Sequence, residues 1–455
     1  MRARSAMRVC ALLGFVLASV CAHADEHWLA AWGAAPLRSP IVPNIQLVHP
    51  PRNRALRNQT VREVVTVGAG GTQVRLHLDN RYGESAVAIG HLTLARMSAG
   101  DAIDTASLVQ VTLHGKGKWS LPAAGSIDTD AVAFNTHTGD RVAVSVYVPQ
   151  AAEPASWHTD ARYAQSVSAE GDHAEEAVLP GAIKTPGYDW LTRVDVAPGG
   201  GASAIVTLGD SITNGFRASA GLSYPEQLAA RLRQAGCDSP VINMGIDGNQ
   251  VAAGHGNFGQ GDSMIERFAH DVAPVPGARY LVLLGGINDI GEPTMAAKAA
   301  NQPTPDGQAL ASPVIAGLKR LAQDARQLGL RVYGATLPPF GGTERAFTAQ
   351  GEAARQAINA WIRHGAPYDA IIDFDAALRD AAQPERMQAR FDSGDHIHPN
   401  DAGYGEMAKT IPLALFACKA ATASVDIRPS LPPATRAGAL ARVPTVPFQA
   451  LGARR

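Results

Sequence analysis

The sequence predicts an α/β protein in which a doubly wound parallel sheet follows a β-rich region. After Gly201, short apolar runs alternate with amphipathic helical patterns, which is typical of parallel strands joined by helical crossovers. Before Gly199, the chain shows short strand-like runs separated by turn residues, and no helical period of useful length interrupts them. These two patterns together indicate two domains of different class.

Length and composition agree with this organisation. At 455 residues the chain is long enough for two domains with a core each. Its 40 basic and 41 acidic residues nearly cancel, so charge gives no reason to expect nucleic acid or an anionic membrane as a partner. The content of 46% hydrophobic and 18% charged residues is ordinary for a globular protein.

Residues 1–24 are predicted to be a secretory signal peptide. Three arginines precede the apolar run 9–20, which is too short to span a bilayer, and Ala22-His23-Ala24 offers a cleavage site. We therefore expect cleavage after Ala24 and a secreted or periplasmic protein with no membrane span. A lipoprotein signal ending at Cys21 is the alternative, but Val20 is a poor residue before such a cysteine.

Four cysteines are present, and two of them, Cys10 and Cys21, lie within the signal peptide. Cys237 and Cys418 would remain in an oxidising compartment where a disulfide can persist. Each follows a helical pattern that can flank the first strand of the parallel sheet. A disulfide between them and two unpaired, half-buried thiols both remain open.

Residues 25–199 are predicted to form an accessory domain resembling a β-sandwich or jelly roll. The runs 61–67 and 74–78 flank the glycine-rich residues 68–71, so a hairpin with a glycine turn is expected. Further strands are expected at 89–95, 108–113 and 142–148.

Four tryptophans fall in the β-rich region. Stacking on sugar rings is one use for such residues, and packing in a core or between domains is the commoner one. The sequence therefore favours packing for Trp28, Trp32, Trp119 and Trp157.

Residues 200–420 are predicted to hold five parallel strands with helices on both faces. The strands are expected at 205–208, 240–243, 279–284, 330–335 and 369–373. The helices are expected at about 223–235, 262–272, 312–328, 346–364 and 401–417. The tail 421–455 is rich in proline, lacks periodicity and is expected to be disordered.

Ser211 is the candidate nucleophile. It follows the first parallel strand in Gly209-Asp210-Ser211, at the carboxyl end where α/β sheets carry their chemistry. A serine at the mouth of the following helix exposes its Oγ. Its own N–H is among the free donors of the helix start, where it can stabilise an oxyanion.

Three further loops at strand ends supply the other groups that acyl transfer by a serine requires. Asp395 and His398, three positions apart before the last helix, provide an acid and a base. The Gly248 N–H and the Asn288 side-chain amide can join the Ser211 N–H as oxyanion donors. Glycine in addition lets the acyl oxygen approach the backbone closely.

In this order, these segments resemble blocks I, II, III and V of the SGNH/GDSL hydrolase family. They comprise residues 205–215, 243–248, 286–289 and 395–398. The resemblance covers about residues 200–420, and block I reads GDSI rather than GDSL, which is a conservative change. Residues 28–33, 80–83 and 373–378 further resemble a secreted bacterial subgroup with an amino-terminal β-rich domain. Block IV is not identified.

The resemblance implies a flavodoxin-like fold with Ser211 as nucleophile and His398 as base, oriented by Asp395. Gly248 and Asn288 would complete the oxyanion hole with Ser211. No cofactor and no metal is expected. The family indicates mechanism far better than substrate.

We therefore expect an exported serine esterase acting on short-acyl, above all acetyl, esters of carbohydrate. The substrate partner would be a small-molecule or polysaccharide ester. A short-chain or lipid ester hydrolase is one alternative, and a glycan-binding surface protein with a vestigial hydrolase domain is another. Oligomeric state is not indicated by the sequence.

Two carboxylates and one histidine near these segments invite other interpretations. Asp210 and Asp289 are expected to structure their loops through hydrogen bonds. A metal site built from His396, His398 and Asp395 is less favoured because it leaves the serine and the asparagine unexplained.

Two further segments are candidates for walls of the substrate cleft. Residues 254–259 match a nucleotide-binding glycine pattern but do not open a βαβ unit, so a nucleotide site is not indicated. Residues 337–340 follow the fourth parallel strand and hold the second candidate position.

Overall fold

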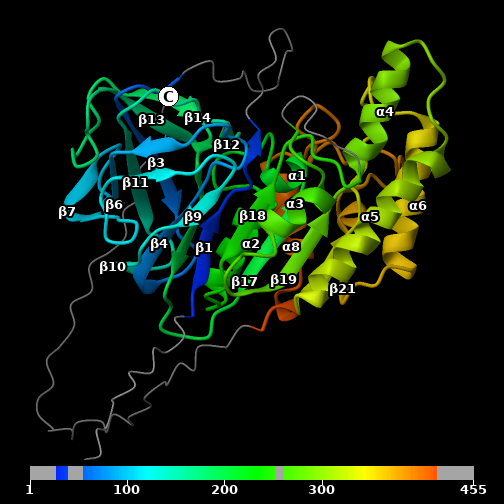
Figure 1. Cartoon of the computed structure of the whole chain (residues 1–455). Coiled ribbons are helices and arrows are strands. Elements are labelled where there is room, and N and C mark those ends of the chain that lie inside the picture. Colours follow the sequence, from blue (N-terminus) through cyan, green and yellow to red (C-terminus); the bar gives the residue numbers. More distant parts are fainter. Residues whose placement is uncertain (1–26, 39–54, 161, 253–259, 418–455) are drawn as a thin grey trace, which may run out of the picture. The chain divides into compact units, whose positions relative to one another are not determined.

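The computed structural model describes residues 27–38, 55–160, 162–252 and 260–417 (Figure 1). These residues belong to one compact unit, which extends to Ala420. The predicted signal peptide, the tail from residue 421, the segment 254–259 and Cys418 lie outside the described residues. Within them, no helix has the length and apolar character needed to cross a membrane.

A parallel sheet of five strands forms the centre of residues 204–417, in agreement with the prediction. Across the sheet the strands are β18 (Val241–Gly245), β17 (Ala204–Gly209), β19 (Ala278–Leu284), β20 (Arg331–Ala335) and β21 (Ala370–Ile372). All neighbouring pairs are parallel. Because β17 is first in sequence but second in the sheet, the chain reverses its winding there, which makes the doubly wound switch point.

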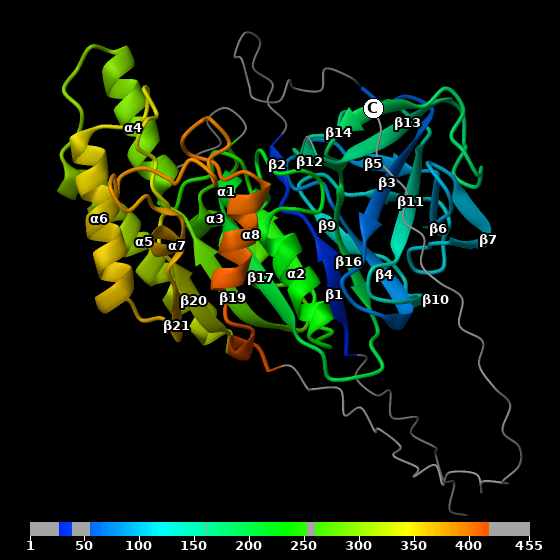
Figure 2. The same ribbon diagram turned by 180° about the vertical axis from the view of Figure 1, so that it is seen from behind.

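Helices cover both faces of the parallel sheet (Figures 1 and 2). On one face, α2 (Tyr224–Gln234) packs beside α8 (Asp401–Thr410). On the other, α5 (Gly307–Gln327) contacts both α3 (Met264–Asp271) and α6 (Ala349–His364). With both faces covered, every residue of β17 is buried, which explains its nearly continuous apolar run.

Three of the predicted helix boundaries need correction. The last helix ends at Thr410 rather than 417, because Ile411 precedes Pro412 and adopts an extended conformation, as residues before proline do. Helix α5 begins at Gly307 rather than 312, where the Asp306 side chain accepts a hydrogen bond from the Ala309 N–H at 2.8 Å. Helix α6 begins at Ala349.

Helix α4 (Ile287–Ala299) was not predicted. Its sequence contains Gly291 and Pro293, which both disfavour helix interiors, and Gly286 caps it with a φ of 125°. Shorter elements are α1 (Ser211–Asn214), α7 (Phe374–Leu378) and a 3-10 turn (Leu413–Leu415).

The amino-terminal region consists of antiparallel sheets, as predicted. One contains β1 (Leu29–Gly33), β16 (Leu191–Val196), β4 (Gly71–Asp79), β10 (Val132–Thr136) and β9 (Ser126–Asp128). The second contains β14 (Ile183–Pro186), β13 (Ala164–Glu170), β3 (Gln59–Thr66), β11 (Arg141–Val148), β6 (His91–Met97) and β7 (Ile103–Gln110). Smaller sheets join β15 (Tyr188–Asp189), β12 (Ser156–His158) and β2 (Leu37–Arg38), and β5 (Val87–Ile89) with β8 (Trp119–Leu121).

The predicted hairpin across residues 68–71 is wrong. Strand β3 pairs with β11 and β13, whereas β4 pairs with β16, β10 and β9 in the other large sheet. Gly68 and Gly71 lie where the chain passes from one sheet to the other in close contact with neighbouring segments. A Cβ on Gly68 would lie 2.9 Å from Pro240, and a Cβ on Gly71 would lie 2.7 Å from the Ala197 carbonyl oxygen. Alternation along a strand shows that one face is buried but does not identify its partner.

Two other predicted strands are also shifted. The run 89–95 is divided at Gly90 into β5 and β6, which pair with β8 and with β11 and β7. The run 108–113 corresponds to the earlier strand β7, which ends at Gln110. The run 142–148 matches β11.

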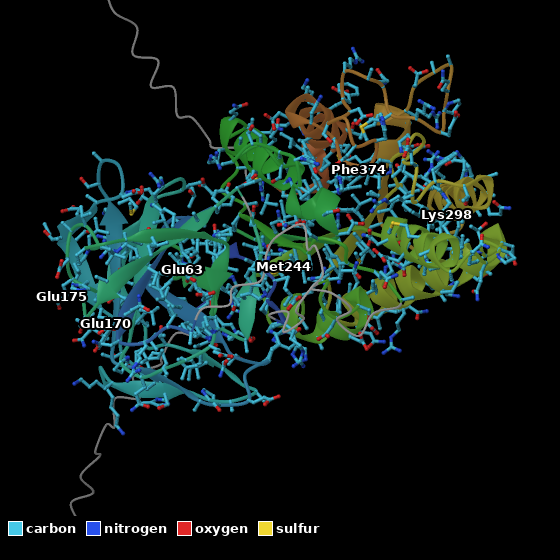
Figure 3. All side chains as sticks on the ribbon, turned by 90° about the horizontal axis from the view of Figure 1, so that it is seen from above. Glu63, Glu170, Glu175, Met244, Lys298 and Phe374 are labelled. Carbon is cyan, nitrogen blue, oxygen red and sulfur yellow. The ribbon has the colours of Figure 1, made fainter. Side chains whose placement is uncertain are left out.

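The β-rich strands cover the edge of the parallel sheet. Strand β1 contacts β18, and Ala34 forms a parallel bridge with Asn243. One continuous hydrophobic core includes buried residues of both regions. Seen from above, Met244 of β18 lies between the β-rich strands and the helical side of the molecule (Figure 3). Because β1 covers the edge, β18 presents no open pairing edge there. We retain the domain boundary near residue 200 as a proposal, at the change from antiparallel to parallel pairing.

Cys237 follows α2, is buried and is disulfide-bonded. The alternative in which Cys237 is a free thiol is therefore wrong. Cys418, its candidate disulfide partner, lies outside the described residues.

The central strand β19 should dominate core stability. Leu281 is 0% exposed in β19, so Leu281→Ala should lower the free energy of unfolding by about 2–5 kcal/mol through lost burial and a cavity. The control is Ile371→Ala at the edge strand β21, where the side chain is 40% exposed. Urea unfolding measures both, and equal losses would contradict this account of the core.

Candidate active site

Ser211, His398 and Asp395 form a continuous chain of hydrogen bonds. The Ser211 Oγ lies 2.7 Å from the His398 Nε2, and the His398 Nδ1 lies 2.9 Å from the Asp395 Oδ2. The sequence predicted these three side chains as nucleophile, base and acid from segments 187 positions apart. The fold brings them together at the carboxyl end of β17.

A tight turn between β17 and α1 positions Ser211. The strand ends at Gly209, where a Cβ would lie only 2.0 Å from the Thr213 Oγ1. The Asp210 side chain then caps α1 by accepting a hydrogen bond from the Ile212 N–H at 2.9 Å. Ser211 is consequently the first helical residue, where backbone N–H groups have no partner inside the helix.

Asp395 holds the ring of His398 and its own loop at once. Its Oδ1 accepts the backbone N–H groups of His398 at 2.8 Å and Ile397 at 3.0 Å. Burial alone would raise the pKa of Asp395, but the hydrogen bonds from the His398 ring and from the two backbone N–H groups outweigh it and hold that pKa well below its usual range. An ionised Asp395 favours the tautomer with the proton on Nδ1, which leaves Nε2 to accept the Ser211 proton.

The ring of His398 is also fixed by packing. The Phe216 ring meets it edge-on, with 4.7 Å between the ring centroids. On the exposed side, Arg217 donates to the Asp395 Oδ2 at 3.3 Å.

The predicted oxyanion donors lie on the loops after β18 and β19, the strands on either side of β17. Gly248 has a φ of 74°, and a Cβ there would lie 2.7 Å from the Gln260 side chain. Asn288 stands in the first turn of α4, and its Nδ2 donates to the Asn249 carbonyl at 3.0 Å. A side-chain amide has two N–H groups, so one remains for an oxyanion.

A buried arginine that sequence reasoning missed connects these loops. Arg267 is 1% exposed and donates to the Gly209 and Met244 carbonyls, each at 2.8 Å, and to the Asn249 Oδ1 at 2.9 Å. It also pairs with Asp271 at 3.0 Å, whose charge opposes the lowering of the arginine pKa by burial. The ends of β17 and β18 and the Gly248 loop are thereby fixed by one guanidinium.

A signal for Arg267 was present in the sequence. Arginine and aspartate four positions apart stand on the buried face of α3 beside Met264 and Phe268. A charged pair on an apolar helix face indicates a specific polar role, because unpaired burial is costly.

The model of the GDSL-like lipase/acylhydrolase family matches residues 207–405. These residues form a GDSL-family hydrolase domain. The match begins within β17 and ends within α8, so it spans Ser211, Gly248, Asn288, Asp395 and His398.

Solved structures similar to this chain include proteins from bacteria and an enzyme from a lake metagenome. A member of the lipolytic protein G-D-S-L family from Veillonella parvula shares 23% identity over 46% of this chain and 96% of its own, with a TM-score of 0.33. An α/β hydrolase from the metagenome of Lake Arreo shares 21% identity over 47% of this chain and 94% of its own (TM-score 0.34). A lipase/acylhydrolase from Enterococcus faecalis shares 17% identity over 46% of this chain and 92% of its own, with a TM-score of 0.33. Comparison with curated proteins returned no match.

A pocket of about 460 Å³ adjoins Asn288 and Asp395 in the GDSL domain. Its apolar lining includes Ile287, Met295, Phe340 and Ile397. Of the segment 337–340 that was predicted as a cleft wall, Phe340 lines this pocket. The segment 254–259, the other predicted wall, lies outside the described residues.

Asp210 and Asp289, which lie close to the catalytic candidates in sequence, form structural hydrogen bonds to backbone N–H groups, as predicted. Asp289 accepts the Val251 and Ala252 N–H groups at 2.8 and 3.0 Å. His396 lies with its Nδ1 2.6 Å from the Asp392 Oδ2. Among the residues that the structure describes, no group of three or more His, Cys, Asp or Glu side chains is arranged to hold a metal ion.

The β-rich region contributes an arginine to the support of α1. Arg162 donates to the Asn214 carbonyl at the end of α1 at 2.6 Å, and it pairs with Asp160 and Glu226, each at 2.7 Å. Tyr163 donates its hydroxyl proton to Glu226 and accepts the Gly221 N–H at 3.0 Å. Arg162 and Tyr163 of the β-rich region therefore hold the segment that follows Ser211 at Asn214 and at Gly221.

Arg162→Lys should disturb turnover more than stability. Lysine keeps the charge but cannot bridge two carboxylates and a carbonyl, so α1 should lose its fixed position and kcat for p-nitrophenyl acetate should fall about tenfold. The matched control is Arg193→Lys, a buried arginine paired with Asp195 and Asp128 within the β-rich region. Steady-state kinetics and thermal unfolding of both variants test this expectation. Equal losses of kcat in the two variants would contradict the role of Arg162 in holding α1.

Asp210 should make stability depend on pH. Burial raises the pKa of Asp210 to about 7, against 3.8 for an ordinary aspartate. The contribution of Asp210 to the free energy of unfolding is thus fully present below about pH 4, where the carboxyl group is protonated in both the folded and the unfolded chain. This contribution is lost as the pH rises through about 7. Asp210→Asn should therefore gain stability relative to the parent between pH 4 and 8, on the order of a few kcal/mol.

Urea unfolding at pH 5 and pH 8 measures this difference. Asp238→Asn is the control, because Asp238 is exposed beyond α2. A difference between Asp210→Asn and the parent that is the same at pH 5 and pH 8 would contradict a pKa near 7 for Asp210.

Proposed function

We propose that the GDSL domain is an exported serine esterase that hydrolyses carboxylic esters through an acyl-enzyme. The observation that carries this proposal is the unbroken relay from the Ser211 Oγ through His398 to Asp395, with contacts of 2.7 and 2.9 Å. A relay of this kind lets a serine act as a nucleophile at neutral pH.

In the first half-reaction, the Ser211 Oγ attacks the acyl carbon and transfers its proton to the His398 Nε2. Asp395 stabilises the imidazolium through the hydrogen bond to Nδ1. The tetrahedral oxyanion accepts hydrogen bonds from the Ser211 and Gly248 N–H groups and the Asn288 amide. Collapse expels the alcohol, which takes the proton from Nε2 and leaves the acyl group on Ser211.

In the second half-reaction, water replaces the alcohol. His398 takes a proton from the water as it attacks the acyl-enzyme, and the same donors meet the second oxyanion. Collapse releases the carboxylic acid and returns the proton to Ser211. The residues named here complete the cycle without a cofactor.

For the substrate we propose acetyl esters of carbohydrate, supported by the signal-like amino terminus and the attached β-rich region. A second candidate is a short-chain or lipid ester, which the apolar 460 Å³ pocket beside Asn288 favours. Acyl-chain preference separates the two candidates, because a longer chain gains from burial in that pocket.

The first test is hydrolysis of p-nitrophenyl acetate, butyrate and octanoate by the protein and by Ser211→Ala. Turnover that disappears in Ser211→Ala supports the serine mechanism, and retained turnover in pure Ser211→Ala removes it. Turnover confined to acetate supports the acetyl-ester substrate, whereas turnover that rises with chain length supports the second candidate.

Asn288→Ala tests the oxyanion role. It should lower kcat by about 10²–10³ with little change in thermal unfolding, because one donor to the oxyanion is lost. Gln302→Ala, an exposed amide just beyond α4, is the control and should leave kcat unchanged. A loss below about threefold in Asn288→Ala would argue against its role as an oxyanion donor.

A further inference from the structure

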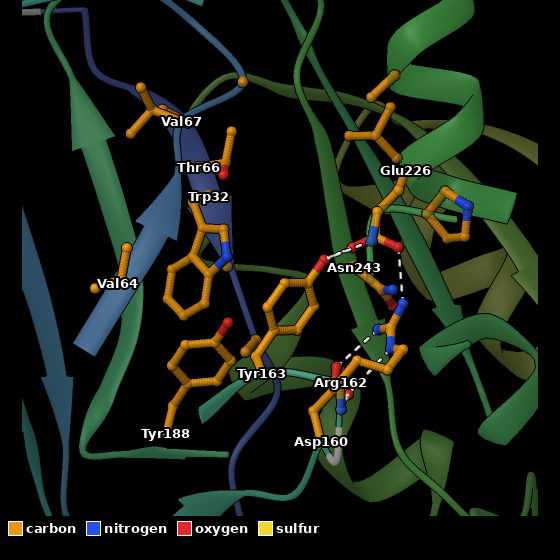
Figure 4. Close-up of a pocket in the computed structure, with 18 of the residues that line it drawn as sticks. Trp32, Val64, Thr66, Val67, Asp160, Arg162, Tyr163, Tyr188, Glu226 and Asn243 are labelled. Atoms are coloured by element: carbon orange, nitrogen blue, oxygen red, sulfur yellow. Dashed lines mark hydrogen bonds and ion pairs between the residues drawn. The ribbon is translucent and has the colours of Figure 1, made fainter. Parts of the chain in front are cut away.

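A second pocket, of about 400 Å³, opens between the β-rich strands and α2 (Figure 4). Its volume falls in the range of about 300–1,000 Å³ that is typical of small-molecule sites. Asn214 of α1 contributes to its wall, but Ser211, His398 and Asn288 are not among its lining residues. The pocket is therefore separate from the proposed catalytic site.

The β-rich side of this pocket is aromatic. Trp32 of β1 and Tyr188 of β15 meet edge to face with ring centroids 4.9 Å apart, and Tyr163 lies 6.3 Å from Tyr188 (Figure 4). Trp32 is only partly buried, unlike Trp157, which is 4% exposed. The predicted packing role fits both residues, but Trp157 is buried in the core, whereas Trp32 packs against the core and leaves part of its indole in the pocket.

The α2 side of the pocket is formed by Pro225, Glu226, Ala229, Ala230 and Arg233. Ala229 and Ala230 present only methyl groups toward it, and both are partly exposed. The two small side chains between Glu226 and Arg233 leave room beside the aromatic rings for a flat ring with apolar C–H faces.

Some of the charged side chains in the pocket are paired with one another, and others have no ion-pair partner. Arg162 is already committed to Asp160 and Glu226, and these three side chains bind one another. Arg141 and Arg233 also line the pocket, are exposed, and form no ion pair with any residue in the described part of the chain. Guanidinium groups without an ion-pair partner are suited to a planar carboxylate, which each can bind through paired hydrogen bonds.

We propose that this pocket is a non-catalytic binding site for a saccharide that carries a carboxylate, such as a uronic acid residue of an oligosaccharide. The sugar ring lies against Trp32 and Tyr163, and its carboxylate pairs with Arg141 and Arg233. The site does not depend on the proposed esterase reaction, because none of the residues proposed for catalysis lines it.

Calorimetric titration of the full chain with trigalacturonate and with cellotriose tests the proposal. Neither probe carries an acyl ester, so hydrolysis does not interfere. Trigalacturonate should bind, and cellotriose should bind at least tenfold more weakly or not at all. Absence of binding by both probes, or equal binding by both, would overturn the proposal.

Variants locate the binding. The double variant Arg141→Gln/Arg233→Gln should weaken trigalacturonate binding at least tenfold, and Trp32→Leu should do so independently. The controls are Arg279→Gln, an exposed arginine of β19 outside the pocket, and Trp119→Phe, a partly buried tryptophan of β8. Pocket variants that retain parental affinity would overturn the proposed site.

The same variants separate this proposal from the proposed function. Ser211→Ala should bind trigalacturonate as the parent does while losing ester turnover. The double arginine variant should hydrolyse p-nitrophenyl acetate at the parental rate, because neither arginine is part of the proposed catalytic machinery.

Discussion

The site depends on the tight turn from β17 into α1. Gly209 ends the strand where a side chain would collide with Thr213, and its carbonyl is held by the buried Arg267. Asp210 caps the helix, which leaves Ser211 at the start of α1 with its hydroxyl toward His398. A change at any of these positions would move the nucleophile relative to its base, and reactive geometry tolerates little displacement.

Support for this turn comes from two directions. Inside the parallel sheet, Arg267 joins the ends of β17 and β18 to the loop that carries Gly248. From the β-rich region, Arg162 holds the far end of α1, and Arg81 reaches Asp271, the partner of Arg267, at 3.2 Å. The β-rich region is thus a structural part of the proposed active site as well as a wall of the second pocket, and its removal should cost activity as well as binding.

Much of the parallel domain could be predicted because its signals are local. Each strand is a short apolar run between helical patterns, and Ser211, Gly248 and Asn288 each follow a strand, where parallel topology brings loops together, whereas Asp395 and His398 precede the last helix. Elements with conflicting local signals were missed, as with α4, whose Gly291 and Pro293 oppose the helix that packing stabilises. In the β-rich region the alternation revealed strands, but β3 and β4 lie in different sheets because pairing depends on contacts distant in sequence.

The sequence alone determined the order of the parallel strands along the chain and the residue types of the proposed site: a serine, a glycine, an asparagine, an aspartate and a histidine, each at a strand end or before the last helix. Only the tertiary structure decided which side chains hold these groups in place. Arg162, Arg141 and Arg233 carry no local pattern that distinguishes them from solvent-exposed arginines, and for Arg267 the pairing with Asp271 on an apolar helix face indicates a polar role but not its partners. Their roles arise from burial and from carbonyls, carboxylates and rings supplied by distant segments, which a one-dimensional pattern does not encode.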